Sequence, residues 1–113
     1  MTILEAVKAT DSVLLTPEID QNREISVGYA CDLLSWVMSH GENGMAWITV
    51  QTHMNVIAVA SLADMACVIV PEGIAVDAAI ASKAQEEGIA VLSTKKSAFE
   101  VSGILYSAGV RCK

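Results

Sequence analysis

Basic residues are scarce in this sequence. Only seven Lys and Arg stand against 13 Asp and Glu, and the formal net charge is −6. Nucleic-acid binding is not expected, because neutralisation of phosphates by basic side chains supplies most of the affinity of such complexes. No apolar run reaches the roughly 18 residues that a membrane-spanning helix needs. The first residues carry Glu5 and lack the long apolar centre of a secretory signal peptide, so we expect a cytoplasmic protein without membrane contact.

The motifs of several enzyme classes are also missing. The two histidines, His40 and His53, belong to no HExxH or other metal-spaced pair, and the three cysteines form no CxxC pair. No GxxxxGK[ST] phosphate loop and no GxGxxG are present. We therefore expect neither a metal nor a cofactor, and we assign no catalytic residue. Cys67 falls in an apolar run, where a cysteine usually acts as a small buried hydrophobe, and Trp36 and Trp47 are expected in the core.

Apolar residues, in contrast, are abundant. They make up 53% of the chain, which at 113 residues has room for one domain, spanning 1–113. So high an apolar share in so small a domain indicates that a partner covers part of the surface, most simply a second copy.

Periodicity predicts alternating helices and strands. The expected helices are 3–9, 33–39, 54–65, 77–87 and 97–108, and the expected strands are 12–16, 24–29, 45–50, 66–70 and 89–92. Thr2 with Glu5 and Ser97 with Glu100 fit capping boxes, and Asp32 is positioned to cap helix 33–39.

Strands separated by single helices pair in parallel through right-handed crossovers. The fold class is therefore α/β, a three-layer α/β/α domain with a mostly parallel central sheet. The clean alternation of 24–29 indicates a half-solvated strand, which we place at a mixed edge of that sheet.

Ligands of open α/β sheets bind beyond the carboxyl ends of the strands, where 29–32, 51–55 and 93–97 should converge. The tentative ligand site lists the polar residues of these segments: Asp32, Gln51, Thr52, His53, Asn55, Thr94 and Ser97. The run 51–55 offers more donors and acceptors than a helix cap needs. The alternative is that Thr52 or Asn55 merely caps the helix, while His53 is exposed to solvent or bonded to the backbone.

The run Ser93-Thr94-Lys95-Lys96-Ser97 opens a helix, and helix N-termini favour anions. A phosphate or carboxylate is one reading of it, and a solvated loop in which Ser97 only caps is the other. A small enzyme with His53 as general base near Asp32 remains a third kind of function, although no serine or cysteine stands out as its nucleophile.

Taken in order, the chain resembles the DRTGG-domain family, including the N-terminal domain of HPr kinase/phosphorylase. The resemblance rests on four runs: Val27–Ser35, Trp47–Leu62, Ile89–Thr94 and Ser97–Glu100. The literal DRTGG string is absent, as is the P-loop of the kinase, so kinase activity is not implied. The resemblance implies a stand-alone α/β/α domain that dimerises and has a regulatory role. We predict a non-catalytic sensor of a small anionic metabolite or nucleotide, or an adaptor for a protein partner, acting as a homodimer.

Overall fold

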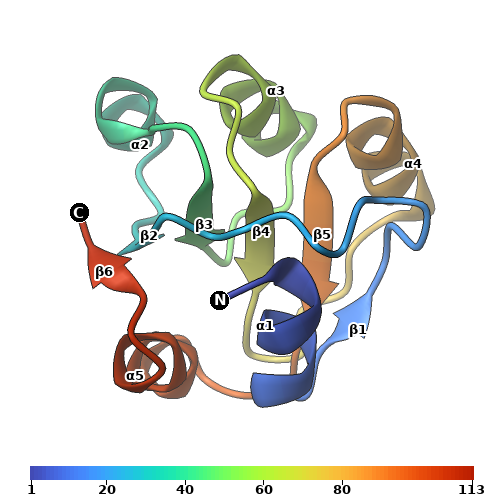
Figure 1. Cartoon of the computed structure of the whole chain (residues 1–113). Coiled ribbons are helices and arrows are strands. Elements are labelled where there is room, and N and C mark those ends of the chain that lie inside the picture. Colours follow the sequence, from blue (N-terminus) through green and yellow to red (C-terminus); the bar gives the residue numbers. More distant parts are fainter.

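The computed structural model describes all residues from Met1 to Lys113. One six-stranded sheet, in the order β1-β5-β4-β3-β2-β6, lies between two layers of helices (Figure 1). The strands are β1 (Val13–Leu14), β2 (Val27–Ala30), β3 (Met45–Ile48), β4 (Cys67–Val70), β5 (Ala90–Ser93) and β6 (Arg111–Cys112). The helices are α1 (Ile3–Ala9), α2 (Leu34–His40), α3 (Met54–Leu62), α4 (Ala78–Glu86) and α5 (Ala98–Ser107).

The layers agree with the fold class expected from the sequence. Helices α2, α3 and α4 cover one face of the sheet, and α1 and α5 cover the other (Figure 1). Strands β2, β3, β4 and β5 run parallel to one another, as crossover helices require. The three-layer α/β/α architecture with a mostly parallel sheet is confirmed.

The mixed edge lies elsewhere than expected. β2 pairs in parallel with β3, and its other side is covered by β6, which also runs parallel to it. The antiparallel edge strand is β1, whose Val13 pairs with Ser93 of β5. The expectation that 24–29 forms an edge strand was wrong, because β6 lies beyond it. β6 is only two residues long, too short to show a periodicity in the sequence.

Side chains of the central strands alternate between two cores. On β3, Met45 and Trp47 enter the core under α2, α3 and α4, whereas Ala46 and Ile48 enter the core over α1 and α5. Trp47 is fully buried. A strand buried on both faces reads as a continuous apolar run, which is why β3 was recognisable in the sequence.

Both expected capping boxes are present. The hydroxyl of Thr2 accepts from the N–H of Glu5, and the Glu5 carboxylate accepts from the N–H of Thr2. The backbone N–H of Thr2 contributes most to lowering the pKa of the Glu5 carboxyl, and the Thr2 hydroxyl contributes next. Ser97 and Glu100 make the same reciprocal pair at the start of α5.

Trp36 departs from its expected place in the core. Its side chain is 52% exposed on α2. The indole N–H donates to the Tyr29 hydroxyl (2.6 Å), and the indole ring stacks on His40 at a centroid distance of 4.3 Å. An indole can take such a half-exposed position because its N–H finds a partner.

The five helices are seven to ten residues long. None of the five helices combines the length and the apolar character needed to cross a bilayer.

Candidate functional site

Asp32 joins the ends of β2 and β3. Its carboxylate accepts from the Thr49 hydroxyl (2.8 Å) and from the N–H of Val50 (3.0 Å). The sequence suggested that Asp32 caps α2, and this expectation was wrong because its carboxylate is bonded elsewhere. The N-cap position is Leu33, and no side chain caps it. Asp32 points instead to the next strand because the parallel pairing of β2 with β3 brings the end of β3 within its reach.

Gln51 belongs to the same network. Its side-chain amide donates to the carbonyl of Asp32 (3.3 Å), and its backbone N–H donates to the Thr49 hydroxyl (3.2 Å). On the inner side, the Trp47 indole N–H donates to the carbonyl of Cys31 (2.7 Å). These bonds fix the start of the loop that leads from β3 into α3.

The remaining polar residues of this loop have no partner within the chain. His53 occupies the N-cap position of α3 but makes no capping bond. Neither the side chains of Thr52, His53 and Asn55 nor the backbone N–H groups of Met54 and Asn55 take part in a hydrogen bond. The idea that Thr52 or Asn55 caps the helix is not supported by this geometry. The first turn of α3 thus offers free donors beside three free polar side chains.

Apolar side chains border these polar groups. Leu33 is 62% exposed next to Asp32, and Val50 and Met54 are also exposed on either side of the loop. A ligand with both an apolar and an anionic part would meet both kinds of group here.

Thr94 and Ser97 have a different environment. The buried Thr94 hydroxyl donates to the carbonyl of Thr10 (2.8 Å) and accepts from the N–H of Lys96 (3.2 Å). The Ser97 hydroxyl caps α5. Each hydroxyl is therefore already used to hold the structure together.

The N-terminus of α5 also has its own anions. The Glu100 carboxylate accepts from the N–H of Ser97, and the Glu72 carboxylate accepts from the N–H of Ala98 (3.4 Å). Glu72 adopts a left-handed backbone conformation, φ +67°, to reach this place from the end of β4. A phosphate at this helix end would meet two carboxylates, which disfavours it.

The three segments therefore form two groups along the carboxyl edge of the sheet. Asp32 and Gln51 are in contact, and Thr52, His53 and Asn55 continue the same loop. Thr94 and Ser97 follow β5, which β4 separates from β3. A surface cavity of about 500 Å³ is lined by Thr94, Lys95 and Lys96 among others. In the loop from β3 to α3 only Met54 lines a cavity, one of about 360 Å³ between α3 and α4, and the polar residues of the loop line none.

The side chains offer little support for catalysis or for metal binding. No three His, Cys, Asp or Glu side chains lie close enough together to hold a metal ion. The Asp32 carboxylate bonds with Thr49 and Val50, and His53 has no carboxylate to orient it. Burial raises the pKa of the Cys67 thiol to about 12, so this thiol is no nucleophile.

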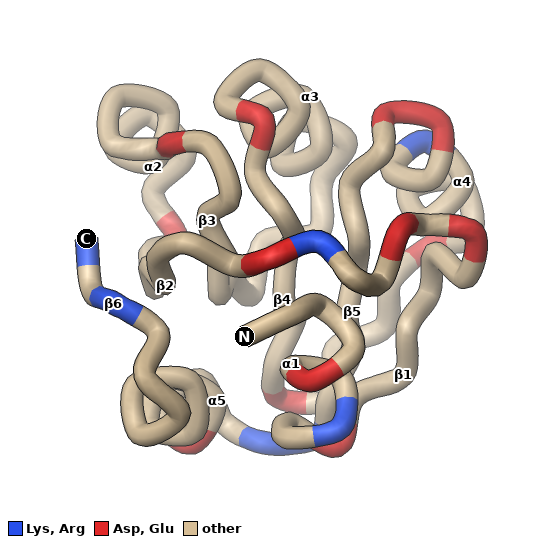
Figure 2. The backbone as a smooth tube through the Cα atoms, in the orientation of Figure 1, with Lys and Arg blue, Asp and Glu red and all other residues tan.

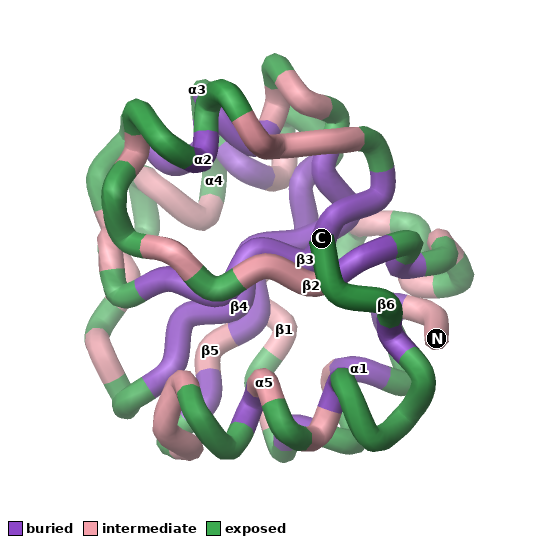
Figure 3. The backbone as a smooth tube through the Cα atoms, turned by 90° about the vertical axis from the view of Figure 1, so that its left-hand side faces the viewer, coloured by how far each residue is buried: buried purple, intermediate pink, exposed green.

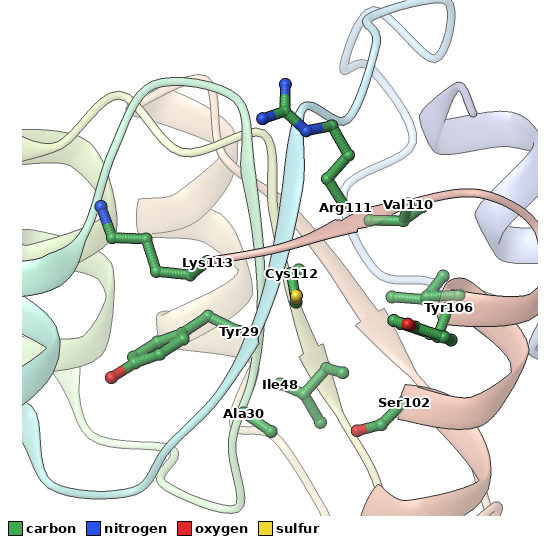
Figure 4. A pocket seen from close by; sticks show the side chains of 11 residues that line it. Tyr29, Ala30, Ile48, Ser102, Tyr106, Val110, Arg111, Cys112 and Lys113 are labelled. Carbon is green, nitrogen blue, oxygen red and sulfur yellow. The ribbon is translucent and has the colours of Figure 1, made fainter.

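A cavity that sequence reasoning missed lies between β2, β6 and α5. Its volume is about 340 Å³, and it is mainly apolar. Figure 4 shows Ala30, Ile48, Ser102, Tyr106 and Cys112 around it. The signal in the sequence was weak: Gly28 and Ala30 are the small residues at alternate positions of β2, and they leave this space unfilled.

Comparisons with known proteins agree with the fold. The family model described as the DRTGG domain matches residues 2–108. No curated protein sequence matches the chain. A similar solved structure contains the CBS and DRTGG domains of the regulatory region of Clostridium perfringens pyrophosphatase, complexed with its activator, diadenosine tetraphosphate. The TM-score is 0.76 at 13% identity, over 92% of this chain and 45% of that chain.

That likeness shows a shared fold and no more. The chain spans less than half the length of the pyrophosphatase region that it matches. The similarity to the N-terminal domain of HPr kinase/phosphorylase stays a prediction.

Proposed function

The chain belongs to the DRTGG domain family, and from this premise we propose that it is a non-catalytic regulatory domain that senses a small anionic metabolite or nucleotide. We place the ligand at the loop from β3 to α3. The observation that carries this proposal is the set of unpartnered groups there: the side chains of Thr52, His53 and Asn55 and the first N–H groups of α3.

These groups suit an anion attached to an apolar ring. The N–H groups at a helix start carry partial positive charge and bind phosphate or carboxylate oxygens. The exposed side chains of Leu33, Val50 and Met54 offer contact to a base or another flat group. The bonds from Thr49, Val50 and Gln51 to Asp32 hold the loop in one conformation before a ligand arrives, which limits the entropy lost on binding.

The pyrophosphatase region supports a nucleotide as the ligand class. That region is regulatory, and its activator is a dinucleotide. Because its chain is more than twice as long as the matched part, it lends support to the ligand class and not to a particular set of contacts.

A thermal-shift screen against nucleotides, phosphosugars and carboxylates tests the proposal. A ligand at about 100 times its dissociation constant adds about 2.7 kcal/mol to the free energy of unfolding. We expect this gain to be lost in Thr52→Ala and Asn55→Ala, neither of which removes an intrachain bond from the side chain. The matched control is Ser97→Ala, which removes a helix cap and should lower stability by about 1 kcal/mol while the ligand response remains.

Two results would contradict the proposal. One is a ligand response that disappears in Ser97→Ala or Thr94→Val and survives in Asn55→Ala, which would move the site to the end of β5. The other is a screen without any response, which would favour an adaptor that binds a protein partner.

We further propose that the domain works as a homodimer in the cytoplasm. The apolar surplus of the sequence supports the dimer, and so do large apolar side chains on its surface, such as Phe99 and Tyr106. Sedimentation of the purified protein at micromolar concentration tests the dimer independently of any ligand.

A further inference from the structure

The outer face of α5 presents two of the five aromatic residues of the chain. Phe99 is 88% exposed and Tyr106 is 70% exposed. Both lie on the side of α5 opposite Val101 and Leu105, which are buried in the core. Exposed apolar side chains that gather on one face, unlike scattered ones, mark an interaction surface.

Gly103 lies at the centre of the same face, between the two aromatic residues. A glycine inside a helix is unfavourable relative to alanine because it leaves the backbone freer to unfold. A Cβ added at Gly103 would meet no atom within 4 Å, so nothing in this chain requires a glycine there. A glycine at this exposed position would suit the close approach of a second helix from outside the chain.

The cavity of about 340 Å³ opens beside this face. Val27 and Tyr29 of β2 pack toward the core on the other side of the sheet, so Gly28 and Ala30 face α5. Their small size leaves the space bounded by the buried side chains of Ile48, Leu105 and Val110. Figure 4 shows Arg111 and Lys113 extending away from the cavity, which leaves an apolar lining for an occupant.

The charge distribution favours a second copy on this side of the molecule. Residues 1–14 and 93–113 together with Glu72 carry five basic and four acidic side chains, whereas the rest of the chain carries two basic and nine acidic ones. Figure 2 shows the positions of acidic residues along the α2, α3 and α4 layer and the loop in front of the sheet. Two copies of a chain with a net charge of −6 repel each other least through the nearly neutral α5 side.

We propose that two copies pair through α5, with Phe99 of each copy inserted into the cavity between β2, β6 and α5 of the other. Phe99 (the knob) and the cavity between β2, β6 and α5 (the hole) lie on one surface of one chain, as a two-fold dimer requires. With the two α5 helices antiparallel and the axis at Gly103, Phe99 lies opposite Ser107 of the other copy, next to Tyr106 at the mouth of the cavity. Figure 3 shows this side of the molecule, with the exposed part of α5 below the edge formed by β2 and β6.

Sedimentation equilibrium measurements on three variants test the pairing. Phe99→Ala removes the knob, and Ala30→Leu fills the hole, with Ser102→Leu as a second filler. Because the symmetry repeats each contact, we expect either change to weaken the dimer on the order of 100-fold. Leu62→Ala is the matched control, because Leu62 is 82% exposed on α3 and its loss should leave the dimer unchanged.

Mixing supplies a sharper test. A homodimer of Phe99→Ala and a homodimer of Ala30→Leu each lack both contacts, whereas a mixed dimer keeps one intact knob in one intact hole. We expect mass spectrometry of an equimolar mixture to show the heterodimer above either homodimer. Gly103→Ala should raise the melting temperature of the monomer, since nothing opposes its Cβ there, and should weaken the dimer.

This inference rests on the homodimer of the proposed function, and the outcomes separate the two. A wild-type protein that stays monomeric at roughly 100 µM overturns both. A dimer that is as strong in Phe99→Ala as in the wild type, or a mixture without heterodimer, overturns the α5 pairing and leaves the homodimer standing. Neither outcome depends on the ligand site at the β3–α3 loop.

Discussion

At the scale of single residues, Asp32 is the best test of how the candidate site is held together. Its carboxylate accepts from the Thr49 hydroxyl and the Val50 N–H, one bond to a side chain and one to the backbone. Replacing Asp32 with Ala leaves both donors without an acceptor. We expect Asp32→Ala to lower the free energy of unfolding by about 1 to 2 kcal/mol, measured by urea denaturation.

Asp32→Asn is the control for this change. The amide oxygen can still accept one of the two hydrogen bonds, so the loss should be smaller than in Asp32→Ala. If both variants were as stable as the wild type, the hydrogen bonds of Asp32 would not fix the loop from β3 to α3. The geometry proposed for the ligand site would then lose its support.

Cys67 and Cys112 should differ in their reactivity toward thiol reagents. Cys67 is fully buried, and burial raises the pKa of its thiol to about 12, whereas Cys112 is exposed. At pH 8, in protein dilute enough to be monomeric, a thiol reagent should modify Cys112 rapidly and Cys67 only after the protein unfolds. Peptide mapping of the labelled native protein would show this order, and native labelling of Cys67 would contradict the buried position of β4.

The burial of Cys67 also determines how this thiol changes the free energy of unfolding with pH. Above about pH 9 the unfolded chain gives up the Cys67 proton, while the folded chain keeps it up to about pH 12. The unfolded state then binds fewer protons than the folded state, so this group lowers the free energy of unfolding as the pH rises through that window. A Cys67→Ser variant would lack most of this contribution.

Residue roles were only partly predictable from the sequence. The buried state of Cys67 and Trp47 followed from the apolar runs that contain them. Asp32 looked like a cap for α2 because that helix starts just after it in the sequence. Its real partners, Thr49 and Val50, follow the end of β3 and are seventeen or more residues away. Likewise, nothing local revealed that the Thr94 hydroxyl bonds to Thr10 at the end of α1.

At the scale of elements, Gly41 links the end of α2 to the end of α3. A Cβ at Gly41 would lie 2.7 Å from the methyl group of Met65 and 3.1 Å from the carbonyl oxygen of Val37. The methyl group of Met65 would have to shift within the buried core, and the Cβ of Ala63 would lie 3.2 Å from the new atom. We expect Gly41→Ala to cost about 1 to 3 kcal/mol of stability, measured by denaturation.

Gly103→Ala is the counterpart for this prediction, because its Cβ would meet nothing. The two substitutions make the same chemical change and should shift monomer stability in opposite directions. Equal effects would mean that the packing between α2 and α3 is looser than the distances indicate.

Elements with local causes were predicted best. The capping boxes at Thr2 and Ser97 each depend on residues three apart, and both were recognised. Helix α3 ends at Leu62, three residues before the expected end, because Asp64 turns into the left-handed conformation that starts the loop to β4. Strand β6 was missed since its existence depends on pairing with β2 and not on its own two residues.

At the scale of the whole molecule, the parallel order of β2 to β5 followed from the alternation of strands and helices, but the grouping of the site residues did not. The sequence put three polar segments at one edge of the sheet without their order across it. With β4 between β3 and β5, the end of β5 lies apart from the loop that carries Thr52, His53 and Asn55. Strand order depends on long-range packing, which periodicity does not record.

The charge asymmetry of the molecule leads to a prediction about salt. Two copies that each carry −6 repel at long range, while the α5 side contributes almost no net charge to this repulsion. Raising the ionic strength from about 0.01 M to about 0.1 M shortens the Debye length from about 30 Å to about 10 Å. The repulsion is then screened, and the apolar contact of Phe99 with the cavity is not. We expect the dissociation constant of the dimer to fall several-fold over this range, measured by sedimentation equilibrium. A dissociation constant that rises with salt would instead mean that ion pairs, and not the apolar contact of Phe99 with the cavity, hold the two copies together.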